Sequence, residues 1–185
     1  MHELILGGQK SGKSRCAEER AQAWLTAPER QAVLLATAMA GDDEMRARIV
    51  RHRLERARRV PRLAVEEEHH DLAAAIQRLS QPSRLVVVDC LTLWLTQRMM
   101  PLHGAPREAS VIEADRERLL AALKAANGPV VLVSNEIGLG VSPLGRETRH
   151  FLDELGRLHQ AVARVCERVT LMVAGIELPV KRAPA

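Results

Sequence analysis

Aromatic side chains are scarce in this sequence of 185 residues, which contains one phenylalanine, two tryptophans and no tyrosine. Proteins that bind single-stranded nucleic acids stack bases on aromatic side chains, and this chain offers too few of them for such a platform. Its arginines also gather in one stretch, residues 46–59, instead of spreading along a groove. The formal net charge of +4 suits phosphorylated small molecules as well as nucleic acids. We therefore expect no nucleic-acid partner.

Cysteines and long apolar runs are also scarce. The three cysteines, Cys16, Cys90 and Cys166, are odd in number and widely spaced, which is typical of reduced thiols and not of a disulfide framework or a metal site. No apolar run is long enough to span a bilayer, and because the N-terminus leads directly into an apolar strand, we expect no signal peptide. We expect a cytoplasmic protein without a membrane span, folded as a single domain over residues 1–185.

A glycine-rich segment near the N-terminus carries the strongest functional signal. Residues 7–14 read GGQKSGKS and match the pattern G-x-x-x-x-G-K-[ST], between an apolar strand at residues 4–6 and a helix at residues 15–25. In such a loop the backbone N–H groups and the N-terminus of the helix surround a polyphosphate. Lys13 would reach the terminal phosphates, and the hydroxyl of Ser14 would hold Mg²⁺. A chance glycine-rich turn is the alternative, and the order of strand, loop and helix argues against it.

Short apolar segments alternate with amphipathic segments along the rest of the chain. This alternation is typical of an α/β fold with a mostly parallel central sheet flanked by helices. Together with the phosphate loop it predicts a single P-loop domain of the RecA-like type. Strands are expected at residues 31–36, 62–65, 84–89, 129–134 and 169–174, the last of these being the final strand, and helices at residues 42–58, 71–79, 91–100, 112–126 and 151–165.

Asp89 stands at the end of the apolar strand 84–89. In a protein with a phosphate loop, a carboxylate at the end of a buried strand is well placed to hold Mg²⁺ opposite Ser14. Aspartate is also a favoured helix N-cap, so Asp89 could instead begin the helix that starts near Leu91. The presence of the phosphate loop favours the magnesium role.

His52 lies in the arginine-rich helix, where helical spacing places it on one face with Met45, Arg48, Ile49 and Arg56. A surface histidine on a solvated basic helix is one interpretation. The other is a nucleophile among cations, in which the arginines lower the pKa of the imidazole and offset the charge of an attacked phosphate. The residue pattern alone leaves both interpretations open.

Asn135 and Glu136 follow the apolar strand 129–134, at the edge of the sheet where ligands bind in open α/β folds. Residues 138–143 after them form a loop whose glycines allow backbone conformations closed to other residues. We expect this loop to belong to a substrate-binding or subunit-contact surface, without a catalytic role. An ordinary strand-to-helix turn is the alternative.

Several segments resemble, in sequence order, the bifunctional adenosylcobinamide kinase/adenosylcobinamide-phosphate guanylyltransferase family of the cobalamin pathway. They are GGQKSGKS, ATAMAGDDEMRARIVRHR, VVVDCLTLWLTQ, VLVSNEIGLGVSP, GRETRHFLDELGRLHQAVA and VTLMVAGIELPVK, and together they cover nearly the whole chain. The resemblance implies that ATP or GTP phosphorylates the aminopropanol hydroxyl of adenosylcobinamide. It further implies that GMP then passes from GTP to the new phosphate, giving adenosylcobinamide-GDP and pyrophosphate.

The resemblance also implies roles for individual residues. In the family the guanylyl group is carried on a histidine, and the residue that matches it is His52. The matching nucleotide-binding positions are Gly7, Gly8, Gln9, Lys10, Ser11, Gly12, Lys13, Ser14, Ala36, Thr37, Ala38, Arg53, Leu54, Glu55, Arg56, Glu66 and Asp89. Glu67 is the alternative to Glu66, because residues 57–64 are longer than the family pattern and lack its usual tryptophan. A solvated acidic patch at residues 66–68 is equally compatible with the sequence.

Two positions, Gln97 and His159, stand where the family pattern has asparagines, and both keep hydrogen-bonding capacity. The implied substrates are adenosylcobinamide, ATP and GTP, the implied cofactor is Mg²⁺, and the implied assembly is a homotrimer. Two rival functions are compatible with the phosphate loop alone. A small-molecule kinase without the transfer step would form no guanylylated protein. A nucleic-acid-dependent ATPase of the RecA-like type would hydrolyse ATP in response to DNA or RNA.

Overall fold

The apolar segments of the sequence form one twisted, mostly parallel sheet. The computed structural model describes residues 1–182, and in this part of the chain the strand order is β3-β2-β4-β5-β1-β6-β7. Neighbouring strands from β3 to β6 pair in parallel, and β7 pairs with β6 in antiparallel orientation. The strands are β1 (His2–Gly7), β2 (Gln31–Ala36), β3 (Leu63–Glu67), β4 (Arg84–Asp89), β5 (Val130–Val133), β6 (Arg168–Val173) and β7 (Ile176–Lys181).

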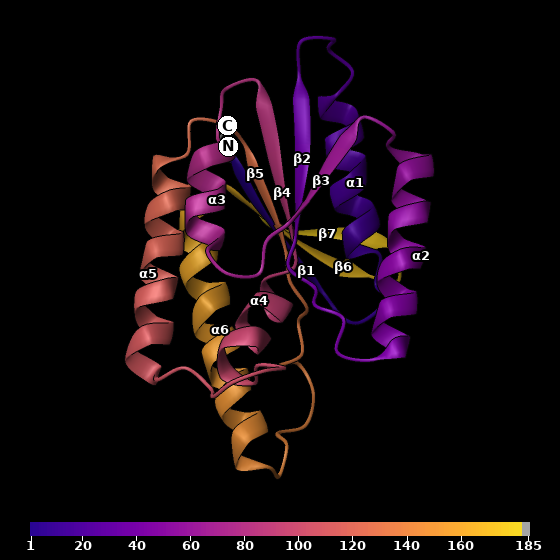
Figure 1. Cartoon of the computed structure of the whole chain (residues 1–185). Coiled ribbons are helices and arrows are strands. Elements are labelled where there is room, and N and C mark those ends of the chain that lie inside the picture. The colour runs from indigo at the N-terminus through magenta and orange to yellow at the C-terminus, as the bar shows by residue number, and fades with distance from the viewer. Residues whose placement is uncertain (183–185) are drawn as a thin grey trace.

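Helices cover both faces of the sheet (Figure 1). Val87 and Val88 are neighbours in β4, yet they belong to two different cores because successive side chains of a strand point to opposite faces. Val88 shares its core with Leu123 of α5, and Val87 shares its core with Ala21 of α1. α3 to α6 cover the first face, while α1 and α2 lie on the second. The helices are α1 (Lys13–Trp24), α2 (Asp43–Arg59), α3 (Leu72–Leu79), α4 (Leu91–Met99), α5 (Ala109–Ala125) and α6 (Arg146–Val165).

Aspartates cap two of these helices, close to where the sequence pattern predicts that they begin. The carboxylate of Asp42 accepts the N–H of Met45 at 2.7 Å, and that of Asp71 accepts the N–H of Ala74 at 3.1 Å. No helix within residues 1–182 combines the length and the apolar character that a membrane span requires.

The prediction that residues 169–174 form the final strand is wrong. A turn with positive φ at Ala174 and Gly175 leads into β7, which pairs back onto β6. Every residue of β7 is exposed, and Pro179 interrupts its apolar residues, so the segment does not have the pattern of a buried strand. Pro179 is tolerated because β7 lies at the edge of the sheet. α6 likewise begins at Arg146, earlier than predicted, because its first turn is exposed and carries no apolar stripe.

The parallel register brings the carboxyl ends of three strands side by side. Ala36 of β2 lies beside Asp89 of β4, and Asp89 lies beside Val133 of β5. β1 is the next strand after β5, so the loop that follows Gly7 opens at the same edge of the sheet. The phosphate loop and Asp89, which the sequence pattern predicts to bind phosphate and magnesium, therefore lie at the same edge of the sheet.

Candidate active site

The segment between β1 and α1 is a tight loop whose shape requires glycine. Gly7 has a φ of 154°, and a Cβ atom there would lie 2.5 Å from Oγ of Ser11 and 2.6 Å from the carbonyl oxygen of Met172. Gly12 has a φ of 103°, in the left-handed region that side chains disfavour, and it precedes the first turn of α1. Since Gly12 brings no side chain to cap this helix, the first N–H groups of α1 are available to an anion.

Lys13 and Ser11 are buried polar side chains of this loop. The ammonium group of Lys13 donates to the carbonyl oxygen of Gly8 at 2.5 Å, which folds the side chain over the loop. Burial lowers the pKa of Lys13, and the Asp89 carboxylate acts in the opposite direction. The hydroxyl of Ser11 has no hydrogen-bond partner among residues 1–182. A buried hydroxyl without a partner is costly, and a phosphate oxygen entering the loop would satisfy it.

Thr37 fixes the backbone around Asp89 at the end of β4. The buried hydroxyl of Thr37 donates to the carbonyl oxygen of Cys90 at 2.7 Å and accepts the N–H of Cys90 at 2.8 Å. The N–H of Thr37 donates to the carbonyl oxygen of Asp89 at 3.1 Å. The residue at the N-cap of α4 is Cys90, so the Asp89 carboxylate is not used to cap that helix. Asp89 thus presents its side chain at the edge of the sheet from a fixed backbone.

A buried ion-pair network holds α2 against α1 and β4. Arg56 of α2 lies 3.3 Å from Glu18 of α1 and 3.6 Å from Asp89. Arg59 lies 3.2 Å from the second oxygen of Glu18. Burial raises the pKa of Glu18, and Arg59 and Arg56 oppose this shift. Removing one partner of such a buried pair would leave an uncompensated charge, so the network holds the C-terminal half of α2 in place.

His52 lies one helical turn before Arg56 and is half-buried. Burial is the largest cause that lowers the pKa of its imidazole, Arg48 and Arg56 lower it further, and Asp89 raises it. The expected effect of the arginines is therefore confirmed in direction, although burial is the larger cause. Arg48 and Asp89 also act on the pKa of Lys13. Arg48 and Asp89 thus influence the pKa of both His52 and Lys13.

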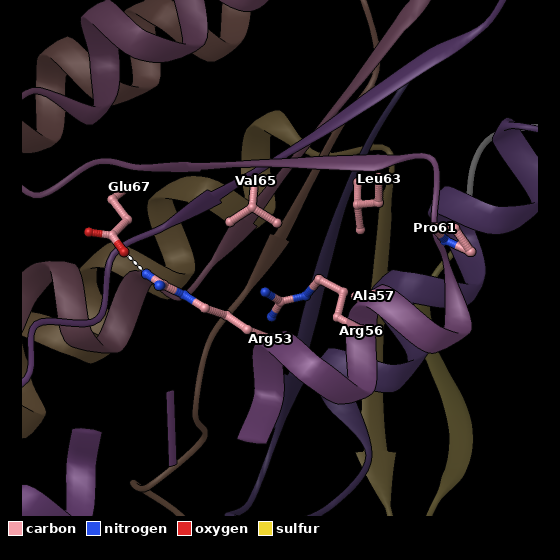
Figure 2. Close-up of a pocket in the computed structure, with 7 residues that line it drawn as sticks. All are labelled: Arg53, Arg56, Ala57, Pro61, Leu63, Val65 and Glu67. Carbon is pink, nitrogen blue, oxygen red and sulfur yellow. Dashed lines mark ion pairs between the residues drawn. The ribbon is translucent and has the colours of Figure 1, made fainter. Parts of the chain in front are cut away.

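A pocket of about 460 Å³ opens between α2 and β3. Figure 2 shows Arg53 and Arg56 of α2 on one side of it, with Leu63 and Val65 of β3 on the other. Glu67 lies at the end of β3 and forms an ion pair with Arg53. The pocket combines an apolar wall with a few charged groups, an arrangement that is typical of small-molecule sites.

The structure separates the two candidate glutamates. Glu66 pairs with Arg78 of α3, on the opposite face of the sheet, whereas Glu67 lines the pocket. The geometry therefore favours Glu67 over Glu66 as a ligand-binding residue. Leu54 and Glu55, which the resemblance also implies, do not line this pocket, and Leu54 is 58% exposed.

Sequence reasoning missed Glu18, which holds the two arginines of α2. The signal that could have found it is a carboxylate at a buried helical position, between Ala17 and Ala21 of α1. It also missed a buried chain of polar side chains that includes Ser134 and His159. These side chains come from distant segments, and no local pattern joins them.

Residues 3–180 match the model of a family described as cobinamide kinase / cobinamide phosphate guanyltransferase. The bifunctional adenosylcobalamin biosynthesis protein CobP of Pseudomonas aeruginosa is 47% identical over 185 residues, covering 100% of this chain and 99% of that protein. The bifunctional adenosylcobalamin biosynthesis proteins CobU of Escherichia coli and Salmonella typhimurium are 36% and 33% identical, each covering 96% of this chain and 98% of the relative. The chain therefore belongs to the cobinamide kinase/cobinamide phosphate guanyltransferase family.

Proposed function

We propose that this chain carries out both reactions of its family at the edge of the sheet described above. It first phosphorylates adenosylcobinamide and then transfers GMP to the new phosphate. The observation that carries the proposal is the position of α2, whose Arg56, one turn after His52, lies 3.6 Å from Asp89 at the edge of the sheet where the phosphate loop opens. A nucleotide whose phosphates lie in the loop after β1 would then extend toward the imidazole.

In the kinase step, Lys13 and the backbone N–H groups of the loop hold the terminal phosphates of ATP or GTP. Ser11 donates its buried hydroxyl to a phosphate oxygen. The aminopropanol hydroxyl of adenosylcobinamide attacks the γ-phosphorus and gives up its proton to solvent, the bond from that phosphorus to the bridging oxygen breaks, and ADP or GDP leaves. The protein mainly positions the reactants and offsets charge, as is general for phosphoryl transfer.

In the transfer step, a ring nitrogen of His52 attacks the α-phosphorus of GTP and pyrophosphate leaves. The nucleophile must be neutral, and its lowered pKa keeps it neutral near pH 7. Arg48 and Arg56 offset the negative charge that develops on the phosphate. The phosphate of adenosylcobinamide phosphate then attacks the phosphorus of the adduct, which releases the imidazole and gives adenosylcobinamide-GDP.

Mg²⁺ fits the donors at this edge. Ser14 is half-buried on the first turn of α1, and the side chain of Asp89 is 18% exposed at the end of β4. Within residues 1–182, no three His, Cys, Asp or Glu side chains cluster as a metal site. Mg²⁺ does not need such a cluster, because it binds through one or two protein oxygens together with phosphates and water. When bound, Mg²⁺ neutralises charge on the phosphates.

The pocket between α2 and β3 is suited to the guanosine of GTP. Leu63 and Val65 supply an apolar wall for the base. The Glu67 carboxylate can accept hydrogen bonds from guanine, which carries an exocyclic amino group as a donor. Arg53 follows His52 directly in α2 and would lie on the phosphate side of the base. This assignment uses Glu67 in place of Glu66.

We also propose that the chain forms a homotrimer in the cytoplasm. The loop between β5 and α6 exposes Leu139, Val141 and Leu144, whose exposed fractions are 81%, 97% and 97%. Apolar side chains gathered on one exposed loop support a subunit contact. Sedimentation velocity would detect the trimer, and a monomer under assay conditions would contradict it. Cell fractionation tests the location.

GTP labelled at the α-phosphate tests the proposed function. We expect an acid-labile label on the wild-type protein and no label on His52→Ala, which should still phosphorylate adenosylcobinamide. The control is His103→Ala, whose side chain lies on an exposed loop, and this variant should be labelled like the wild type. A label that persists on His52→Ala would place the nucleophile elsewhere. Lys13→Ala should lose kinase turnover, and unchanged turnover would reject the role of the phosphate loop.

A further inference from the structure

Four polar side chains form a buried chain between α4, the end of β5 and α6. Oγ of Ser134 lies 3.0 Å from Oγ1 of Thr92 and 2.7 Å from Nε2 of His159. Nδ1 of His159 lies 3.5 Å from Oε2 of Glu136. Ser134 has no exposed surface, and His159 is 7% exposed. The chain joins three elements through contacts that are largely closed to solvent.

The contacts of His159 favour one of its two neutral tautomers. Burial lowers the pKa of His159, and Glu136 opposes that shift as the charged group that acts on it, so the ring is neutral near pH 7. The Glu136 carboxylate can only accept, so we infer that the hydrogen resides on Nδ1. Nε2 is then an acceptor, and the hydroxyl of Ser134 donates to it.

Glu136 connects this buried chain to the phosphate loop. Its backbone N–H donates to the carbonyl oxygen of Gly7 at 2.9 Å, where the loop begins. Its Oε1 accepts the N–H of Gly138 at 2.7 Å, while its Oε2 faces His159. Both carboxylate oxygens of Glu136 therefore have a partner. The residue is held through its backbone by Gly7 and through its side chain by Gly138 and His159. β5 lies between β4 and β1, so this contact sits between Asp89 and the phosphate loop.

The set of serine, histidine and glutamate is not a nucleophilic site, because the Ser134 hydroxyl is fully buried and no substrate atom could reach it. We propose that His159 is a positioning residue, which holds Glu136 and, through Glu136, the start of the phosphate loop in the conformation that binds the nucleotide. This inference rests on the proposed role of that loop in binding nucleotide phosphates. Without the imidazole, Glu136 loses one partner and no longer holds the start of the phosphate loop in a single conformation. Binding of the nucleotide then has to order the loop, which costs conformational entropy.

Kinase kinetics with ATP and adenosylcobinamide test this inference. We expect His159→Leu to raise KM for ATP by about tenfold, the cost of ordering roughly one backbone residue upon binding. His159→Asn should stay within about threefold of the wild type, because its amide NH₂ group takes the place of Nδ1 and can donate to Glu136. Gln160→Leu, the same replacement at the exposed neighbouring position of α6, should leave KM unchanged.

A purely structural role gives a different result, because loss of folded enzyme lowers kcat and leaves KM unchanged. An unchanged KM in His159→Leu, or a His159→Asn variant as impaired as His159→Leu, would overturn the inference while the proposed function stands. A Lys13→Ala variant with unchanged kinase turnover would instead overturn the proposed function, and this inference with it.

The tautomer of His159 provides a second test if His159→Leu does not fold. Nitrogen-15 NMR of the ring at about pH 8, well above the ordinary histidine pKa, should show the hydrogen on Nδ1 in the wild type. In Glu136→Gln the amide oxygen keeps the N–H of Gly138 and the NH₂ group faces the ring, so the hydrogen should move to Nε2. A wild-type ring protonated on Nε2, or a tautomer that does not change in Glu136→Gln, would contradict the proposed contact.

Discussion

At the scale of single residues, the balance of charges around His52 makes its reactivity depend on pH. Burial, Arg48 and Arg56 lower the pKa of the imidazole from its ordinary value of 6.5, and Asp89 raises it. The neutral, nucleophilic form therefore persists at a pH somewhat below 6.5. Arg48 is exposed, so it can be replaced without removing a packed side chain.

We expect Arg48→Gln to shift the pH dependence of guanylylation to higher pH. The replacement removes a positive charge that lowers the pKa of His52, so the imidazole becomes protonated at a higher pH as the solution is acidified. The initial rate of adduct formation between about pH 5 and pH 8 measures the inflection. Arg46→Gln removes an arginine that pairs with Asp43 and serves as the control. An inflection that stays in place, or moves to lower pH, would show that Arg48 does not act on the histidine.

The sequence revealed the parts of the site that are local patterns, and it could not place those that depend on pairing. The phosphate loop and Asp89 each follow an apolar strand, so short windows were sufficient to find them. Glu66 and Glu67 are adjacent in β3 and point to opposite faces, so a shift of one residue exchanges their environments. The register of β3 against β2 decides between them, and no local pattern in these residues encodes it.

At the scale of elements, Asp115 joins α5 to α4 and to the segment that connects them. Its carboxylate accepts from Arg98 of α4 at 2.9 Å and from Arg107 of the connecting segment at 3.1 Å. The side chains of Arg98 and Asp115 are 3% and 5% exposed. Arg98 also stacks on Trp94, with 4.1 Å between the guanidinium carbon and the ring centroid. The pair is part of the packing between these helices.

We expect Asp115→Ala to lower the free energy of unfolding by about 3–5 kcal/mol, because it leaves the buried guanidinium of Arg98 without its counter-charge. Urea denaturation near neutral pH measures the change. Arg118→Ala removes an exposed partner of the same carboxylate and should cost less than about 1 kcal/mol. Equal losses in the two variants would mean that burial does not govern the strength of this network.

The elements themselves were largely predictable where one face of each is buried. β2 and β4 span the predicted residues. Their bounds were predictable because each contains a short apolar run with polar residues next to it. β7 and the first turn of α6 were missed for the converse reason, since both are exposed; in addition, Pro179 interrupts the apolar residues of β7, and the first turn of α6 has no apolar stripe. The phosphate loop has no buried apolar face, but it could be predicted from the fixed spacing of its glycine, lysine and serine residues.

At the scale of the whole molecule, three histidines link the stability of the fold to pH. Burial is the largest cause that lowers the pKa of His2, His52 and His159. In the unfolded chain these rings would take up protons near the ordinary value of 6.5, whereas in the folded protein they do so at lower pH. Their contribution to stability is therefore complete above about pH 6.5 and is lost as the pH falls through the lowered pKa values. Burial raises the pKa of Glu18, so the contribution of this residue to the free energy of unfolding decreases as the pH rises.

We expect the free energy of unfolding to fall as the pH is lowered from about 6.5 to 5.5, and to fall less steeply in His2→Asn. His2 is 7% exposed, and its Nδ1 accepts the N–H of Val130 at 3.2 Å, a bond that protonation of this nitrogen would break. One fewer linked proton reduces the slope by at most about 1.4 kcal/mol per pH unit. Urea titrations of both proteins at each pH measure the difference, in which the contribution of Glu18 cancels. His103→Asn, at an exposed position of a loop, should keep the wild-type slope and serves as the control. A slope for His2→Asn equal to that of the wild type would show that protonation of the buried imidazole is not linked to folding.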